Sequence, residues 1–115
     1  MIKHCNDLNI IVDTSHLNEK GFWDVAKNSI HPLVATHSNA HAICPHTRNL
    51  TDRQLDAIKD TKGMVGVNFA PAFLRKDGKM LSDTNIQLIA DHFKYLIEYF
   101  GEDHVGFGSD FDGAM

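Results

Sequence analysis

The sequence lacks the features that would direct it to a membrane, to the cell exterior or to nucleic acid. No apolar run approaches the roughly 20 residues that a membrane-spanning helix needs. The first ten residues also lack the apolar stretch of a signal peptide. With a net charge of -4, the chain has no basic excess for nucleic acid or an anionic membrane surface. We therefore expect a cytoplasmic protein with no membrane segment and no nucleic-acid partner.

The sequence also has few cysteines and no glycine-rich loop, and both features exclude classes of protein. Cys5 and Cys44 are the two cysteines, and they do not follow the paired spacing of a zinc-binding motif. We expect both to be free thiols in a reducing compartment, with Cys44 buried. No glycine-rich phosphate-binding loop follows any apolar run, which argues against a nucleotide-binding sheet.

The sequence does contain a regular alternation of short apolar runs and amphipathic segments. The apolar runs predict buried parallel strands at residues 8–13, 33–36, 64–69 and 104–108. The amphipathic segments predict helices at residues 18–28, 50–61 and 84–100. This alternation indicates an α/β fold with about four parallel strands and right-handed crossovers. Four strand–helix steps are half of a (β/α)8 barrel, with a small open sheet as the alternative.

The predicted helices carry start signals. Thr51 and Gln54 have the spacing of a capping box, in which two side chains satisfy free backbone N–H groups reciprocally. Thr84 and Gln87 repeat that spacing, and Asn18 can cap the first of the three helices. Because no closing helix follows the last strand, we expect the chain to be a fragment of a larger barrel.

Polar side chains gather where the predicted strands end. His16 and His37, two of eight histidines, follow the first and second strands, Asn68 closes the third, and Asp110 follows the fourth. The carboxyl ends of parallel barrel strands form the face that holds active sites. Neighbouring strands lie about 4.8 Å apart, and neutral imidazole is a good zinc ligand. His16 and His37 are therefore predicted to share a metal ion, although either alone could merely cap a strand end.

Three charged residues have more than one interpretation. In the segment GSDFDG, Asp110 or Asp112 could act as general base beside a metal-bound water, or both could form an Asp–Gly turn. Arg48 could hold a carboxylate through two parallel hydrogen bonds, or it could be a solvated loop residue, or it could pair with Asp52. From the residues alone these alternatives stay open.

Four segments together resemble the membrane dipeptidase (renal dipeptidase) family of zinc peptidases. They are DTSH at 13–16, HSNA at 37–40, HTRN at 46–49 and GSDFDG at 108–113. The resemblance implies a (β/α)8 barrel with a two-zinc centre and a dipeptide as substrate. It further implies that residues 1–115 are the C-terminal part of this catalytic barrel.

The resemblance also implies a role for each of four residues. His16 and His37 would be the histidine ligands of one Zn2+ or another divalent ion. Arg48 would bind the free carboxylate of the dipeptide, and Asp110 would be the catalytic acid–base residue. The attacking group would be a hydroxide that bridges two metal ions.

The sequence departs from the family pattern in its ligand set. The family has a His-x-Asp pair for the second zinc and a bridging Glu, and neither is found in this sequence. We therefore expect the isolated chain to be inactive. Two other functions stay open. One is another metal-dependent barrel hydrolase of the amidohydrolase type. The other is a non-catalytic half barrel, which would pair with a copy of itself as a homo-oligomer or with another chain through its open sheet edges.

Overall fold

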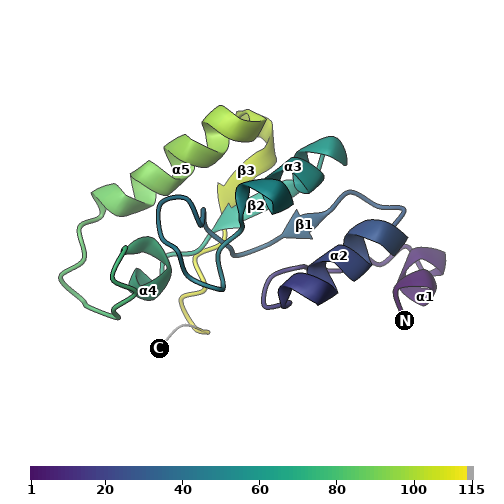
Figure 1. Cartoon of the computed structure of the whole chain (residues 1–115), viewed down its shortest axis with the longest axis horizontal. Coiled ribbons are helices and arrows are strands. Elements are labelled where there is room, and N and C mark those ends of the chain that lie inside the picture. Colours follow the sequence, from purple (N-terminus) through teal and green to yellow (C-terminus); the bar gives the residue numbers. More distant parts are fainter. Residues whose placement is uncertain (114–115) are drawn as a thin grey trace.

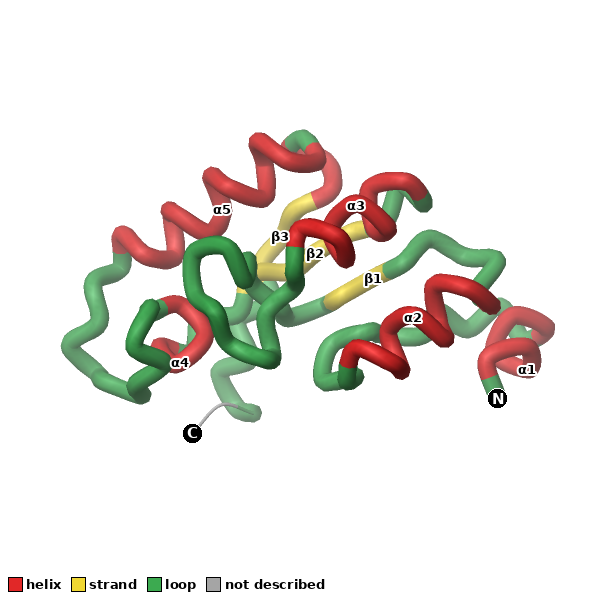
Figure 2. Tube along the Cα trace, viewed as in Figure 1, coloured by secondary structure: helices red, strands yellow, loops and turns green. Residues whose placement is uncertain are grey.

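The computed structural model describes residues 1–113 and shows an α/β fold built on a small parallel sheet (Figure 1). Strand β1 (Val34–Ala35) pairs with β2 (Met64–Val67), and β2 pairs with β3 (Val105–Phe107). Both pairs are parallel, so the strand order β1-β2-β3 follows the sequence. The three strands lie side by side at the centre of the molecule (Figure 2). The α/β class and the parallel arrangement are confirmed.

Helices connect the strands. The longer ones are α2 (Glu19–Asn28), α3 (Asp52–Asp60) and α5 (Gln87–Phe100). The shorter ones are α1 (Ile2–Asp7), α4 (Pro71–Leu74) and the 3-10 helix η1 (Glu102–His104). Among the described residues, no helix combines the length and the apolar character that crossing a membrane requires.

The hydrophobic core lies between the sheet and the three longer helices. Val65 and Val67 of β2 are fully buried and join one apolar cluster with Leu55 of α3 and Leu96 of α5. Burying such a side chain contributes about 1.5–3 kcal/mol. The residue that precedes Val65, Met64, is 45% exposed and lines a shallow hollow on the other face of the sheet. The alternation fits a strand with helices packed on one face.

The predicted first strand, at residues 8–13, is wrong as a regular strand. The segment touches the sheet only through a parallel bridge between Asp13 and Val34. Asn9 has a positive φ of 56°, and the Ile10 N–H donates to Cys5 O of α1 at 2.8 Å. Helix-terminal bonds thus hold the start of the segment, and Ile10 remains 51% exposed. Within residues 1–113 the sheet therefore has three strands and not four.

The capping signals were right for two helices and wrong for the third. Thr51 and Gln54 form the reciprocal capping box of α3, and the Asn18 side chain accepts the Gly21 N–H at the start of α2. Helix α5 begins at Gln87 with no side-chain cap on its flanking residue. Asn85 instead accepts the Gln87 N–H at 2.9 Å, while the Thr84 hydroxyl donates to Leu81 O. Both short residues compete for local backbone groups, which displaces the predicted box.

Both cysteines are free thiols, as predicted, and Cys44 is buried.

A buried histidine joins three segments of the chain. His92 of α5 is fully buried. Its Nδ1 accepts the Ala40 N–H at 3.2 Å, and its Nε2 lies 3.2 Å from Leu74 O of α4. Because one nitrogen must accept and the other must donate, the ring is neutral with its proton on Nε2. Protonation of Nδ1 would break the bond to Ala40.

We expect His92 to make the stability of the fold decrease as the pH falls. Burial lowers the pKa of His92, against the smaller effects of the Leu74 carbonyl and Asp91. In the unfolded chain a histidine takes up its proton near pH 6.5. Below that pH the unfolded state binds more protons than the folded state, so the free energy of unfolding decreases.

Urea unfolding at several pH values between about 7.5 and 5.5 checks this. The decrease should be steeper for the wild type than for His92→Gln, which does not titrate. His4→Gln, a change at an exposed histidine of α1, should keep the wild-type slope. A wild-type slope in His92→Gln would contradict the prediction.

Candidate metal and substrate site

The predicted site residues meet at the edge of the sheet where the strands end. His37 lies two residues beyond β1, and Asp110 lies three residues beyond β3. His16 follows the bridge that Asp13 makes with β1. The rings of His16 and His37 have their centroids 5.0 Å apart and are tilted by 58°. The structure thus brings together two imidazoles that are 21 residues apart in the sequence.

The two imidazoles fit one zinc ion as part of its ligand set. A zinc–nitrogen bond is about 2.0–2.1 Å, so two rings on one ion have centroids no more than about 6 Å apart. The separation of His16 and His37 lies within that limit. Within residues 1–113, however, no group of three or more His, Cys, Asp or Glu side chains converges on one point. On one zinc ion, the pair would supply half of a four-coordinate shell.

Asp13 links the two segments that carry these histidines. Its Oδ1 accepts the N–H of Ser15 and the N–H of Thr36, both at 3.0 Å, and its Oδ2 accepts the Thr36 hydroxyl. Burial opposes ionisation, but these hydrogen bonds outweigh it and hold the pKa of Asp13 below its usual value. Ser15 Oγ in turn accepts the N–H of His37 at 3.0 Å. One carboxylate therefore fixes the backbone on both sides of the pair.

Arg48 reaches the pair from the loop between β1 and α3. Its Nη2 lies 3.2 Å from His16 Nε2 and 3.4 Å from His37 O. The guanidinium lies 5.2 Å from the ring centroid of Phe73, and the Arg48 N–H donates to His46 Nδ1 at 3.1 Å. Arg48 is thus held against both histidines and an aromatic ring, not in a solvated loop.

Arg48 also makes no pair with Asp52. The Asp52 carboxylate accepts the hydroxyl of Tyr95 at 2.7 Å instead.

The charges around the pair favour neutral imidazole at His16. Burial lowers its pKa first, followed by the positive charge of Arg48 and the neighbouring ring of His37, while Asp110 and Asp13 oppose the shift. Burial also lowers the pKa of Arg48, again against Asp110 and Asp13. Asp110 therefore lies within electrostatic reach of both groups. A histidine must be neutral to bind a metal ion, so this field suits a ligand.

Asp110 is held by a buried amide. The Asn68 Nδ2 donates to Asp110 Oδ2 at 3.1 Å. Asn68 is fully buried, its N–H donates to Asn39 Oδ1 at 2.7 Å, and its own Oδ1 accepts the Ala70 N–H at 2.8 Å. Asp112 is exposed. Of the two acids of GSDFDG, the structure fixes Asp110 near the histidines.

Several supporting residues gave little signal in the sequence. Asp13 and Asn68 stood at strand ends, which marked their place but not their partners. Asn39 belongs to the segment HSNA, which did not reveal its partner, and Thr36 precedes that segment without a motif of its own. Phe73 belongs to α4, whose one sequence signal is a proline at its start.

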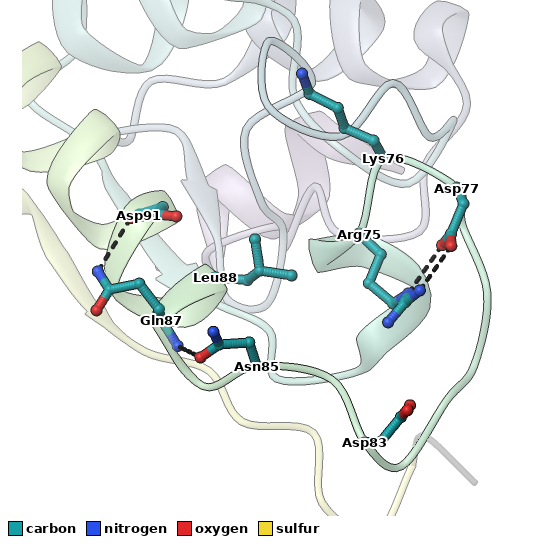
Figure 3. A pocket seen from close by; sticks show the side chains of 8 residues that line it. All are labelled: Arg75, Lys76, Asp77, Asp83, Asn85, Gln87, Leu88 and Asp91. Atoms are coloured by element: carbon teal, nitrogen blue, oxygen red, sulfur yellow. Dashed lines mark hydrogen bonds and ion pairs between the residues drawn. The ribbon is translucent and has the colours of Figure 1, made fainter.

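A second hollow lies between α5 and the loop that precedes it (Figure 3). It has a volume of about 540 Å³ and no histidine in its lining. Two carboxylates of its lining have partners, since Arg75 donates twice to Asp77 and Gln87 donates to Asp91. These contacts are separate from the histidine pair, and we assign the hollow no part in the site.

Comparison with known proteins identifies a family and several relatives. A family model described as membrane dipeptidase (peptidase family M19) matches residues 1–115. A protein from the pqqA 5′ region of Klebsiella pneumoniae, itself uncharacterised, is 60% identical over 113 residues, which are 98% of this chain and 42% of that protein. The dipeptidase tcpJ of Claviceps purpurea is 37% identical over 113 residues, which are 98% of this chain and 26% of that protein.

A solved structure shares the fold closely. The metallo peptidase from Rhodobacter sphaeroides, liganded with a phosphinate mimic of the dipeptide L-Ala-D-Ala, superposes with a TM-score of 0.95 at 59% identity. The match covers 98% of this chain and 32% of that one. The chain thus spans between 26% and 42% of the length of these three relatives.

Close backbone contacts hold Thr36, and with it His37, in place. A Cβ atom added at Gly66 or at Gly108 would collide with the carbonyl oxygen of Thr36. Both glycines therefore let the end of β1 lie close to β2 and to the residue that follows β3. At Gly106, the partner of Gly66 in the ladder, a Cβ would meet only the end of the Met64 side chain at 3.0 Å.

We expect Gly66→Ala to destabilise the chain by about 1–3 kcal/mol, the usual cost of overpacking. Gly106→Ala is the matched control, because a flexible Met64 side chain can move aside at little cost. Urea unfolding of the two variants measures the difference. Equal stabilities would show that the Thr36 carbonyl is not held by this contact.

Proposed function

The chain belongs to the membrane dipeptidase family, peptidase family M19, and from this premise we propose that it supplies part of the catalytic centre of a zinc-dependent dipeptidase. The three parallel strands and their helices would form part of a (β/α)8 barrel. The observation that carries the proposal is the arrangement of His16 and His37, with ring centroids 5.0 Å apart, beside Arg48 at the ends of the strands.

Each of the four residues has a distinct part in the proposed reaction. His16 and His37 would hold zinc, which would supply polarisation of the substrate carbonyl and a lower pKa for the attacking water. Asp110, held by Asn68, would accept a proton from the attacking water and pass it to the leaving amine. Arg48 binds the free carboxylate of the dipeptide.

The surroundings of Arg48 support a role in binding an anion. Its Nε is buried and donates to no atom of residues 1–113. Arginine holds carboxylates through parallel hydrogen bonds from its planar fork of donors. A dipeptide carboxylate would give this buried donor a partner and would match the charge of the guanidinium.

The remaining ligands must come from outside residues 1–113. Two imidazoles leave at least two positions of a zinc shell open, and the described residues offer no third protein ligand. We propose that other sequence of the same protein, or another chain, completes the centre and binds the second zinc. The dipeptide, rather than a nucleic acid, is the proposed partner.

A chimeric enzyme tests the proposed function. Residues 1–115 would replace the matching segment of the Rhodobacter sphaeroides metallo peptidase, to which they are 59% identical. The chimera should hydrolyse L-Ala-D-Ala. Asp110→Asn should lower kcat by about 10²–10⁴-fold with unchanged zinc content, as expected for loss of an acid–base group.

Asp112→Asn is the matched control and should retain activity, because Asp112 is exposed. A folded, zinc-loaded chimera that leaves dipeptides intact would contradict the proposal. Turnover of cyclic amides instead would favour the amidohydrolase alternative. A large loss in Asp112→Asn with none in Asp110→Asn would reverse the assignment of the two acids.

The 115-residue chain on its own should bind zinc weakly and hydrolyse no dipeptide. Half of a zinc shell gives a weak site, and the other proposed ligands are absent from residues 1–113. Zinc titration followed by the histidine ring signals in NMR spectra should move those of His16 and His37. His37→Ala should abolish the response of His16, whereas His4→Ala, at an exposed position of α1, should leave it unchanged.

The opposite result would be dipeptide turnover by the purified 115-residue chain that disappears in His37→Ala. That result would contradict the prediction and show that the chain holds a complete site.

A further inference from the structure

The direction of one pair of hydrogen bonds determines which nitrogen of His37 carries its proton. Thr36 Oγ1 lies 2.7 Å from His37 Nδ1 and also contacts Asp13 Oδ2. The Asp13 carboxylate is ionised and can only accept, so the single hydroxyl proton of Thr36 points to it. The Thr36 oxygen must then accept from His37, which places the ring proton on Nδ1. The lone pair of His37 is therefore on Nε2.

We propose that Asp13 is a positioning residue that acts through Thr36 to hold His37 in the tautomer whose Nε2 is free for a metal ion. The inference rests on the proposed function, in which His37 is a zinc ligand. A histidine ligand usually donates its other ring N–H to an oxygen that fixes its tautomer and orientation. Here that oxygen is the Thr36 hydroxyl, and the Asp13 carboxylate is reached through one further hydrogen bond.

The same carboxylate constrains the segment that carries His16. The Ser15 N–H donates to Asp13 Oδ1, and the next residue, His16, has a positive φ of 71°. This left-handed backbone is costly for a residue other than glycine, so surrounding contacts must hold it. Ser15 Oγ also accepts the His37 N–H. Asp13 thus fixes the tautomer of one proposed ligand and the turn that presents the other.

A purely structural role for Thr36 would have a different signature. The Thr36 N–H bond to Asp13 joins the two segments without its hydroxyl. Replacing Thr36 by valine keeps the N–H bond to Asp13 and the shape of the side chain, and removes the hydroxyl that donates to Asp13 and accepts from His37. Serine keeps the oxygen and removes the methyl group. Comparison of the two variants therefore separates the effect of the hydroxyl from any effect on the stability of the fold.

The experiment reads the His37 tautomer directly, in the 115-residue chain without metal and above the histidine titration range. Long-range ¹H–¹⁵N spectra of ¹⁵N-histidine-labelled protein distinguish a protonated from an unprotonated ring nitrogen. Wild type and Thr36→Ser should show His37 protonated on Nδ1. Thr36→Val should shift His37 toward the Nε2-protonated form. The wild-type spectrum alone overturns the proposal if Nε2 carries the proton, whether or not the variants fold.

Zinc titration of the same samples provides the second measurement. Thr36→Val should bind zinc at His37 about 10–100-fold more weakly than Thr36→Ser, the usual effect of losing the group that orients a histidine ligand. Equal affinities, or an unchanged tautomer in a folded Thr36→Val, would overturn the positioning role.

Failure of the proposed function looks different. In that case the wild-type His37 would be protonated on Nδ1 as expected but would not respond to zinc, and Asp13 would then position a residue that is no ligand.

Discussion

The parallel register of three short strands is the constraint on which the rest of the site depends. Because β1, β2 and β3 run in the same direction, the residues that follow them all emerge at one edge of the sheet. A shift of one residue would turn every side chain of a strand to the opposite face. Gly66 and Gly108 oppose such a shift at β1, since both pack against the Thr36 carbonyl. The sheet is small, but these contacts place His37 within reach of His16.

Local signals in the sequence predicted two of the three longer helix starts. The capping box of Thr51 and Gln54 formed at α3 as expected. The same spacing at Thr84 and Gln87 formed no box, because the Thr84 hydroxyl donates to Leu81 O and Asn85 accepts the Gln87 N–H. The prediction of a strand at residues 8–13 was wrong because an apolar run indicates that a segment can be buried. It does not indicate whether a partner strand is present. Ile10 and Ile11 are about half exposed, at 51% and 54%, and only Asp13 bridges to β1. Strand pairing is a tertiary property that periodicity cannot supply.

The sequence predicted where the candidate site residues lie in the fold, but not which side chains they contact. Topology explains why residues that follow parallel strands, such as His37 and Asp110, lie at one edge. The single bridge between Asp13 and Val34 brings His16 to the same edge. The partners of these residues come from distant segments, as when Asn68 holds Asp110 or Phe73 lies against Arg48. Such contacts depend on rotamers and on packing between elements, which no short motif encodes. The metal and substrate roles of the four residues remain predictions.

The two histidines differ in how their lone pairs are used. The lone pair of His37 Nε2 is left free, because Thr36 engages Nδ1. The Nε2 of His16 accepts an N–H from Arg48, since a guanidinium can only donate. One lone pair cannot accept that hydrogen bond and bind a metal ion at the same time. If His16 Nε2 binds a metal ion as proposed, Arg48 must give up this contact, which would free the same N–H group for a carboxylate. The proposed ligand site and the proposed anion site would then be coupled through a single hydrogen bond.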